Sequence, residues 1–253
     1  CGVEPGSAAV DVARAPVVGG MLETRYPAVG YLMVGPRADE LYGPHCGATL
    51  IAPNLAITAA HCVHDDGPKL GVHIGDEERA ARAIEHRGYE RFVGHDLAAL
   101  VLSEPITSIE PAVVTDVAEG HYRFIGYGRT TPGGYDVMSG YTDERKSGAQ
   151  DVTGFDDLQI CVTGVRAGLC WGDSGGPLMD EDGGVRVYGV LADFDGRFTC
   201  RSGNSMIFTR LGAESQFLRA VALCAAHRSP RACVDEWQAG FVAADGGACA
   251  TYC

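Results

Sequence analysis

The chain has 253 residues, of which 46% are hydrophobic, and carries a formal net charge of −13 at neutral pH. This length and hydrophobic content suffice for one large core or two modest ones. The strong negative charge disfavours nucleic acids and anionic membranes as partners, and no apolar run reaches the length of a transmembrane helix.

Composition also bears on the fold class and the compartment. The 35 glycines and the recurring turn-like clusters favour short strands over long helices. Ten cysteines predict disulfide bonds in an oxidising compartment, so we expect a secreted or extracytoplasmic protein. Metal binding is the alternative, but the sequence has neither a Cys-x-x-Cys pair nor a His-Glu-x-x-His motif. We therefore expect no metal and no cofactor.

The first part of the chain predicts short strands, one of which leads to a histidine. Residues 28–34 are apolar and typical of a strand. Residues 46–51 and 55–60 flank a turn at residues 52–54, which predicts a β-hairpin. The second arm of this hairpin is apolar and is followed directly by His61.

An aspartate, further strands and a helix follow. Asp96 stands at the start of the apolar run 97–102, and the proline-containing stretch 103–120 suits a crossover between two halves. Further strands are expected at residues 124–130, 185–192 and 206–211. Residues 213–225 carry apolar side chains at helical spacing, which predicts a C-terminal amphipathic helix.

A glycine-rich turn at residues 170–178 presents one serine, Ser174. Its glycines allow positive φ angles and the close approach of another backbone. The N–H groups of Gly172 and Ser174 can then point at one spot, as an oxyanion hole requires, because the charge that develops in acyl transfer needs preorganised donors. A serine nucleophile also needs a base, and the base needs a group that orients it. His61 and Asp96 are the candidates for these two roles.

These three segments, in the chain order His61, Asp96, Ser174, resemble the chymotrypsin/trypsin-like serine proteases. The resemblance covers roughly residues 17–225. It implies an all-β fold of two antiparallel Greek-key β-barrels with a C-terminal helix. It also implies a serine-type endopeptidase that acts on protein or peptide substrates, and we expect a monomer.

The resemblance implies a role for each of these residues. Ser174 would be the nucleophile, and His61 would act first as general base and then as general acid. Asp96 would fix the tautomer of the imidazole and stabilise the imidazolium ion. The backbone N–H groups of Gly172 and Ser174 would form the oxyanion hole.

Two disulfide bonds are implied by the same resemblance. One would join Cys46 to Cys62 and pin the histidine loop, and the other would join Cys170 to Cys200 and pin the serine loop. The sequence leaves open how the other six cysteines pair, namely Cys1, Cys161, Cys224, Cys233, Cys249 and Cys253.

An activation step is also implied. Val17 resembles the new N-terminus that the family exposes on cleavage of a zymogen. Its amine would pair with Asp173, the residue before the nucleophile, because a buried carboxylate is costly unless it is paired. Pro16 precedes Val17, where the family has arginine or lysine, so the activating protease stays open.

The residues expected around the substrate depart from the trypsin pattern. Gly168 falls at the base of the pocket, where trypsins carry aspartate, so cleavage after Arg or Lys is not expected. Ala192 leads the strand that faces the substrate, and Trp171 lies beside the serine turn. The bulky Phe194 and Met206 would narrow the pocket. We therefore predict a preference for small aliphatic residues before the scissile bond.

The predicted organisation has three parts. They are a propeptide-like tail, a protease domain and a cysteine-rich extension, at residues 1–16, 17–225 and 226–253. The protease domain would comprise barrel one, barrel two and the C-terminal helix, at about residues 17–115, 116–212 and 213–225. For the extension we predict a small disulfide-pinned tail.

Three alternatives stay open at this stage. The replaced pocket residues and Pro16 are compatible with a catalytically inactive, protease-like binding protein. Cys1 followed by Gly2 is compatible with a lipidated N-terminus that anchors the chain to a membrane. Calcium is a further alternative for the carboxylates that fall where some trypsins bind it, although charged runs are usually solvated faces. These carboxylates belong to Asp76, Glu77, Glu78 and Glu85.

Overall fold

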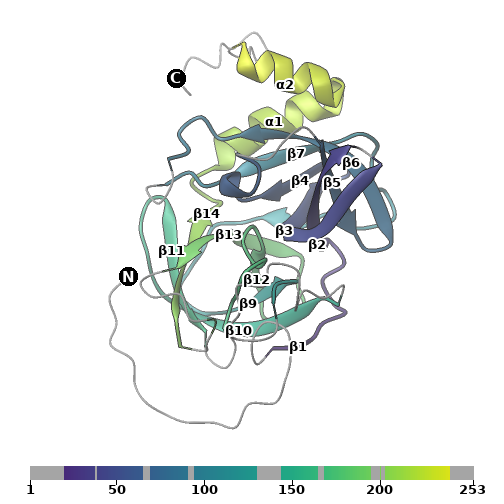
Figure 1. Ribbon diagram of the computed structural model, residues 1–253. Coiled ribbons are helices and arrows are strands. Elements are labelled where there is room, and N and C mark those ends of the chain that lie inside the picture. Colours follow the sequence, from purple (N-terminus) through teal and green to yellow (C-terminus); the bar gives the residue numbers. More distant parts are fainter. Residues whose placement is uncertain are drawn as a thin grey trace.

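The structure is a computed structural model and describes residues 20–37, 39–64, 69–90, 94–129, 144–164, 168–194, 200 and 203–239. Within these residues, β-strands make up most of the regular structure, and two short helices follow at the C-terminal end (Figure 1). None of the helices in these ranges is long and apolar enough to cross a membrane.

The first barrel is closed and antiparallel, with the strand order β2-β3-β4-β7-β6-β5. Its strands are β2 Val29–Arg37, β3 Glu40–Ala52, β4 Leu55–Thr58, β5 Lys69–Ile74, β6 Glu77–Glu85 and β7 Ala98–Leu102. β4 and β7 are buried along their whole length, which explains why their sequences are apolar throughout. Most of β6 alternates between exposed and half-buried side chains, as expected for a strand with one face toward solvent.

The second barrel repeats this arrangement, with the order β9-β10-β11-β14-β13-β12 closed by the pairing of β9 with β12. Its strands are β9 His121–Gly126, β10 Lys146–Phe155, β11 Gln159–Gly164, β12 Pro177–Asp180, β13 Arg186–Phe194 and β14 Ser205–Arg210. Two short strands lie outside it, β1 Met21–Leu22 beside β10 and β8 Val113–Val114 beside β13. In both barrels the first three strands are followed by the last three in reverse order. The predicted fold class is confirmed.

The apolar core continues from one barrel into the other. One cluster of buried side chains includes Leu50 and Leu100 of the first barrel together with Ile125 and Val190 of the second. A second cluster, which includes Phe124, fills the second barrel. Because protein interiors are close-packed, this continuity holds the loops at the junction in a fixed relation.

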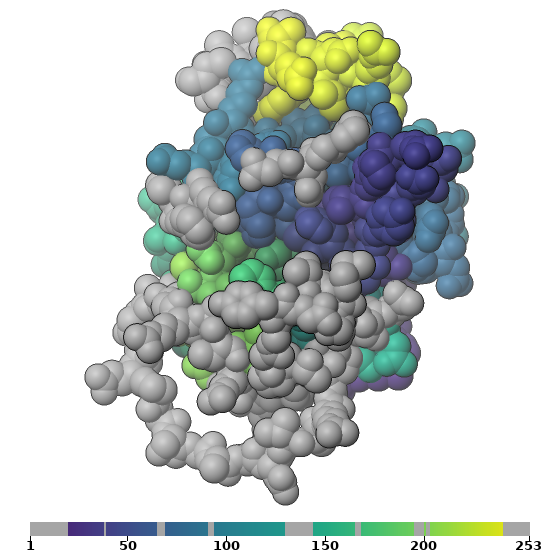
Figure 2. Space-filling view, in the orientation of Figure 1, coloured from purple at the N-terminus to yellow at the C-terminus, as the bar shows by residue number. Residues whose placement is uncertain are grey.

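Two helices cover the outer end of the first barrel, where Figure 2 shows them in yellow as a compact cap. The first, α1 Ser215–His227, begins two residues later and ends two residues later than the predicted helix 213–225. Phe217 and Val221 lie on its buried face. The amphipathic spacing of its sequence is thereby explained by packing against the barrel.

The second helix, α2 Pro230–Gln238, lies where the sequence predicted only a disulfide-pinned tail. The Ser229 hydroxyl accepts a hydrogen bond from the Ala232 N–H at 3.3 Å, and proline follows at the first helical position. The Cys224–Cys233 disulfide joins α2 to α1. Cys161 is disulfide-bonded as well.

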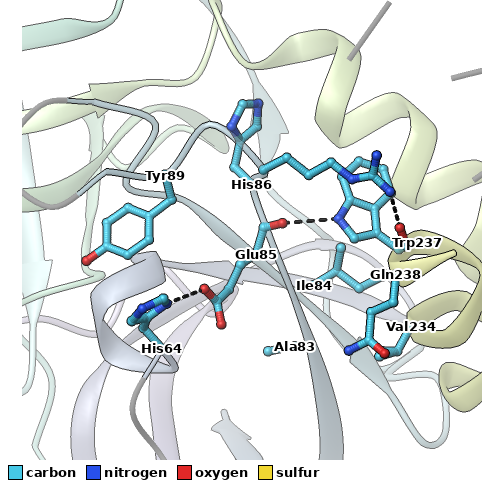
Figure 3. A pocket seen from close by; sticks show the side chains of 10 residues that line it. His64, Ala83, Ile84, Glu85, His86, Tyr89, Val234, Trp237 and Gln238 are labelled. Carbon is cyan, nitrogen blue, oxygen red and sulfur yellow. Dashed lines mark hydrogen bonds and ion pairs between the residues drawn. The ribbon is translucent and has the colours of Figure 1, made fainter. Parts of the chain in front are cut away.

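The α2 helix is anchored to the barrel by its tryptophan. The Trp237 indole N–H donates to the Glu85 carbonyl oxygen at 3.2 Å, and Arg87 donates to the Trp237 carbonyl oxygen (Figure 3). The Trp237 ring also meets Phe217 of α1 edge-on, with ring centroids 5.3 Å apart. The helix α2 is therefore fixed to the end of β6 at Glu85.

Candidate active site

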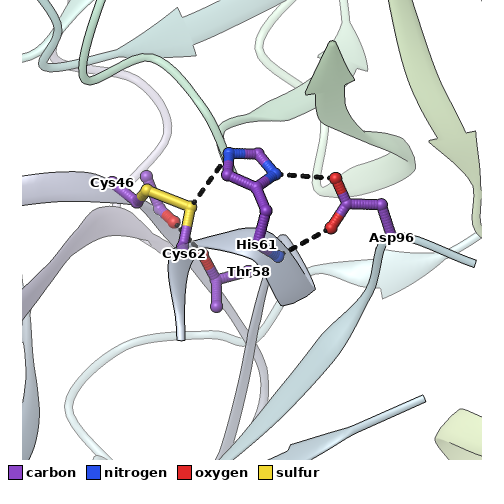
Figure 4. The surroundings of a disulfide bond; sticks show 6 residues. Cys46, Thr58, His61, Cys62 and Asp96 are labelled. Atoms are coloured by element: carbon purple, nitrogen blue, oxygen red, sulfur yellow. Dashed lines mark hydrogen bonds and ion pairs between the residues drawn. A yellow bond between two sulfur atoms is a disulfide. The ribbon is translucent and has the colours of Figure 1, made fainter. Parts of the chain in front are cut away.

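His61 is held by attachments on both sides. β4 ends at Thr58, whose hydroxyl donates to the Gly47 carbonyl oxygen at 2.8 Å. The chain then forms the short 3-10 helix η1, Ala60–Cys62, and the Cys46–Cys62 disulfide ties this helix to β3 (Figure 4). The backbone of His61 is thus fixed by the first barrel.

Asp96 contacts His61 through both carboxylate oxygens. Its Oδ1 accepts the backbone N–H of His61 at 2.9 Å, and its Oδ2 lies 2.7 Å from His61 Nδ1 (Figure 4). The aspartate is 9% exposed, so this contact is screened little by water. Thr209 of β14 donates its hydroxyl to the Asp96 carbonyl oxygen at 2.9 Å, which ties the aspartate to the second barrel.

These contacts define which imidazole nitrogen can act as a base. A carboxylate beside Nδ1 favours the tautomer with the proton on Nδ1, which leaves Nε2 as a proton acceptor. Nε2 lies 3.6 Å from Cys62 Sγ. That sulfur is in the Cys46–Cys62 disulfide, so it has no proton to donate, and neither cysteine offers a thiolate to a metal ion.

The serine turn lies between the two barrels. Gly47 of β3 donates its N–H to the Ser174 carbonyl oxygen at 2.7 Å, and Gly175 donates to the Leu191 carbonyl oxygen of β13 at 2.9 Å. The Cys170–Cys200 disulfide closes the base of the turn. Both barrels thereby hold the turn, and Ser174 itself is half-buried.

The serine turn abuts the strand that leads to His61. A Cβ atom on Gly175, whose φ is +77°, would lie 2.3 Å from Thr58 Oγ1 and 3.1 Å from the Ala59 nitrogen. Only glycine allows this approach. Among the described residues, no hydrogen bond joins the Ser174 hydroxyl to the His61 imidazole. The structure therefore brings the serine and histidine segments into contact and pairs His61 with Asp96.

Asp173 is fully buried directly before Ser174. Its Oδ1 accepts the Gly128 N–H at 2.9 Å and its Oδ2 accepts the Cys170 N–H at 2.8 Å. Burial raises the pKa of Asp173 to about 7, and these two hydrogen bonds oppose the rise. In the part of the chain that the structure describes, no cationic side chain contacts this carboxylate.

Three further residues were predicted to take part in activation or in the oxyanion hole, namely Val17, Gly172 and Ser174. Val17, the proposed partner of Asp173, lies outside the described residues. Gly172 has a φ of +89°, which glycine adopts without strain. Within the described segments, the N–H groups of Gly172 and Ser174 donate to no other protein group.

The residues predicted to line the substrate pocket have different exposures. Trp171 is 59% exposed, whereas Gly168 is buried. Ala192 and Phe194 are half-buried on β13. Met206 of β14 has no exposed surface and belongs to the apolar cluster of the second barrel. Met206 therefore fills space inside the barrel and offers no exposed wall.

Sequence reasoning did not single out the residues that hold this site from behind. Gly47, Thr58 and Thr209 look like ordinary strand residues, and their partners are distant in the sequence. Thr209, for example, bonds a residue 113 positions away. Their role becomes visible only in the structure, where the strands β3, β4 and β14 meet at the junction of the two barrels.

Replacing Gly47 with alanine should damage the serine turn. The new Cβ would lie 2.5 Å from the Gly176 Cα and nitrogen, which are backbone atoms that cannot rotate away. We expect a loss of about 1–3 kcal/mol in the free energy of unfolding, measured by urea denaturation, together with a lower kcat. Gly154→Ala is the matched control, because its Cβ would meet nothing within 4 Å. Equal stability of the two variants would contradict the contact.

Known proteins resemble this chain in sequence. The sequence model of the family described as Trypsin matches residues 30–214. Trypsin-1 from Astacus astacus is 28% identical over 210 residues, which are 70% of this chain and 88% of the relative. The suppressor of tumorigenicity 14 protein homolog from Bos taurus is 28% identical over 222 residues, but this chain spans only 25% of its length.

The fold has a counterpart among solved structures. Neuropsin, described as a serine protease expressed in the limbic system of mouse brain, superposes with a TM-score of 0.63 and 17% sequence identity. The match covers 79% of this chain and 97% of neuropsin. The family model covers more than half of the chain, and the chain therefore belongs to the trypsin family of serine-type endopeptidases.

Proposed function

We propose that the protein hydrolyses peptide bonds in proteins through an acyl-enzyme formed on Ser174. The observation that carries the proposal is the pair of hydrogen bonds between His61 and the buried Asp96, which leaves Nε2 as a proton acceptor on the segment that follows the strand packed against the serine turn. The N–H groups of Gly172 and Ser174, which donate to no other group among the described residues, support an oxyanion site on the serine turn.

The reaction follows from these groups. As Ser174 Oγ attacks the substrate carbonyl carbon, its proton passes to His61 Nε2, and the carbonyl oxygen takes the negative charge. The N–H groups of Gly172 and Ser174 stabilise that oxygen. The imidazolium then gives its proton to the leaving amine, the C–N bond breaks, and the acyl-enzyme remains. Water, activated by His61 in the same way, releases the acid and restores Ser174.

Activation belongs to the same proposal. A cut before Val17 would free an α-amino group, and the fully buried Asp173 is the carboxylate suited to receive it. A cation there would favour the ionised carboxylate and so lower the pKa that burial has raised. The chain would accordingly be made as a zymogen. Its disulfide bonds favour a location in an oxidising compartment outside the cytoplasm.

The proposed substrate preference is for small aliphatic residues before the scissile bond. It is supported by the absence of an acidic side chain at Gly168 and by the bulky, half-buried Phe194 on the same strand as Ala192. An acidic group would be needed to bind Arg or Lys, and the Phe194 side chain would leave less room for a large aromatic residue of the substrate.

Digestion of a denatured protein mixture tests both parts of the proposal. When the chain cut before Val17 is the enzyme, mass spectrometry should identify new termini in the substrate proteins that follow small aliphatic residues. The Ser174→Ala variant should produce none. Cleavage mainly after Arg or Lys would overturn the preference but leave the activity. If the cut wild type yields no new termini, the protein is better described as a protease-like binding protein.

A further inference from the structure

A buried cluster of two histidines and a glutamate lies directly behind Asp96. Glu214 is 2% exposed and His86 is 6% exposed. Glu214 Oε1 lies 2.7 Å from His95 Nδ1, and Glu214 Oε2 lies 3.3 Å from His86 Nε2. The two imidazole rings are stacked, with centroids 4.3 Å apart and planes 11° from parallel.

The glutamate is directed at the histidines and not at its own helix. Glu214 occupies the N-cap position of α1, where a short polar side chain usually accepts a helix N–H. Its carboxylate makes no such capping bond. A buried carboxylate is costly unless donors surround it, and the hydrogen bond with His95 Nδ1 supplies one such donor while His86 lies beside the second oxygen.

The position of the protons follows from the backbone. His86 Nδ1 accepts the Gly88 N–H at 3.0 Å, so the proton of a neutral His86 is on Nε2 and faces Glu214. Burial, together with a smaller effect of the nearby His95, lowers the pKa of His86 to about 4, so His86 is neutral at physiological pH. The carboxylate is therefore hydrogen-bonded to His95 Nδ1, and the N–H of the neutral His86 lies beside its other oxygen, with the two heavy atoms 3.3 Å apart.

A shared metal ion fits this arrangement poorly. A metal bound to imidazole lies near the plane of the ring, and the planes of two stacked rings only 11° from parallel do not meet within the length of a metal–nitrogen bond. His86 would also have to lose the proton on Nε2 while Nδ1 remains an acceptor for Gly88. The cluster is thus a hydrogen-bonded unit.

This unit holds a backbone conformation that histidine seldom adopts. His95 has a φ of +53°, in the left-handed region that is uncommon for residues other than glycine. Its carbonyl oxygen accepts the Leu97 N–H at 2.7 Å, so Asp96 is the central residue of a tight turn. Any change in the His95 backbone would therefore turn the Asp96 carboxylate relative to His61.

We propose that Glu214 is a positioning residue for the catalytic machinery, which acts through His95 to fix the orientation of Asp96 against His61. This inference rests on the proposed function of His61 and Asp96. It makes the start of α1 part of the active site's support, together with Thr209 at the end of the second barrel.

Four variants of the full chain, cut before Val17, test the proposal. Glu214→Gln keeps one acceptor oxygen but turns an amide N–H toward the other ring N–H, and His95→Ala removes the donor. Both should lower kcat by about 10–100-fold with KM nearly unchanged. His95→Asn should retain kcat, because asparagine tolerates positive φ and its amide can donate to Glu214. Asp180→Asn is the control for loss of a buried carboxylate elsewhere, at 8% exposure.

Proton NMR of the His61 Nδ1–H resonance gives a second readout that does not need turnover. We expect it to shift in Glu214→Gln and His95→Ala, and to stay in place in His95→Asn and Asp180→Asn. An unmoved resonance in Glu214→Gln overturns the positioning role, and so does a kcat for His95→Asn as low as that of His95→Ala. A wild type without turnover but with the expected shifts overturns the proposed function and leaves the positioning role intact.

Discussion

Replacing Asp96 with asparagine is expected to lower kcat by about 10⁴-fold with little effect on folding. The asparagine oxygen can accept only one of the two hydrogen bonds that Asp96 now accepts, from the His61 N–H at 2.9 Å and from Nδ1 at 2.7 Å. If the amide nitrogen faces Nδ1, the imidazole proton moves to Nε2. The lone pair of His61 then lies on Nδ1, so Nε2 cannot act as the base that the proposed mechanism requires.

The matched control for this variant is Asp76→Asn, which removes an exposed carboxylate. Steady-state kinetics on a peptide substrate, with urea denaturation of each variant, separates lost catalysis from lost stability. A kcat for Asp96→Asn within tenfold of the wild type would show that the His61–Asp96 contact does not set the tautomer.

The contribution of Asp173 to the stability of the uncut chain is expected to fall as the pH rises from about 4 to about 7. Burial raises the pKa of Asp173 from 3.8 to about 7. Below pH 4 the carboxyl group is protonated in both the folded and the unfolded states, so its stabilising contribution is fully present. Between the two pKa values only the unfolded state loses its proton. The contribution of Asp173 to the free energy of unfolding therefore falls over this range, by up to about 4 kcal/mol in total.

Urea denaturation between pH 4 and pH 8 measures this effect as the difference between the wild type and Asp173→Asn. The variant should lack this part of the pH dependence, because asparagine does not ionise. After cleavage before Val17, pairing with the new amine should lower the pKa of Asp173 and abolish the decline. A pH dependence that is the same in wild type and variant would contradict the assignment to Asp173.

Much of the fold could be predicted because the relevant signals are local. The apolar run ending before His61 and the one after Asp96 became β4 and β7, since strands buried on both faces need continuous apolar sequence. The second helix was missed, although Ser229 and Pro230 form a recognisable helix start. Its stability depends on the distant contacts of Trp237 with β6, which no local pattern reveals.

The candidate site was predictable to a different degree for each residue. His61 and Ser174 stand in recognisable motifs, and the structure brings their segments together. Met206 was expected at a pocket wall, but it is buried in the barrel because strand register, and not sequence position, decides which face it takes. Glu214 gave no signal, because a glutamate near a helix N-terminus is ordinarily explained by its favourable interaction with the helix dipole.

The most direct test of the account is the intact mass of the chain after exposure to a fluorophosphonate probe, before and after a cut at Val17. We predict a single adduct on Ser174 in the cut chain, with none in Ser174→Ala and much slower labelling of the uncut chain. Failure of both forms to react, under conditions in which an ordinary trypsin is labelled, would contradict the assignment of Ser174 as a nucleophile activated by His61.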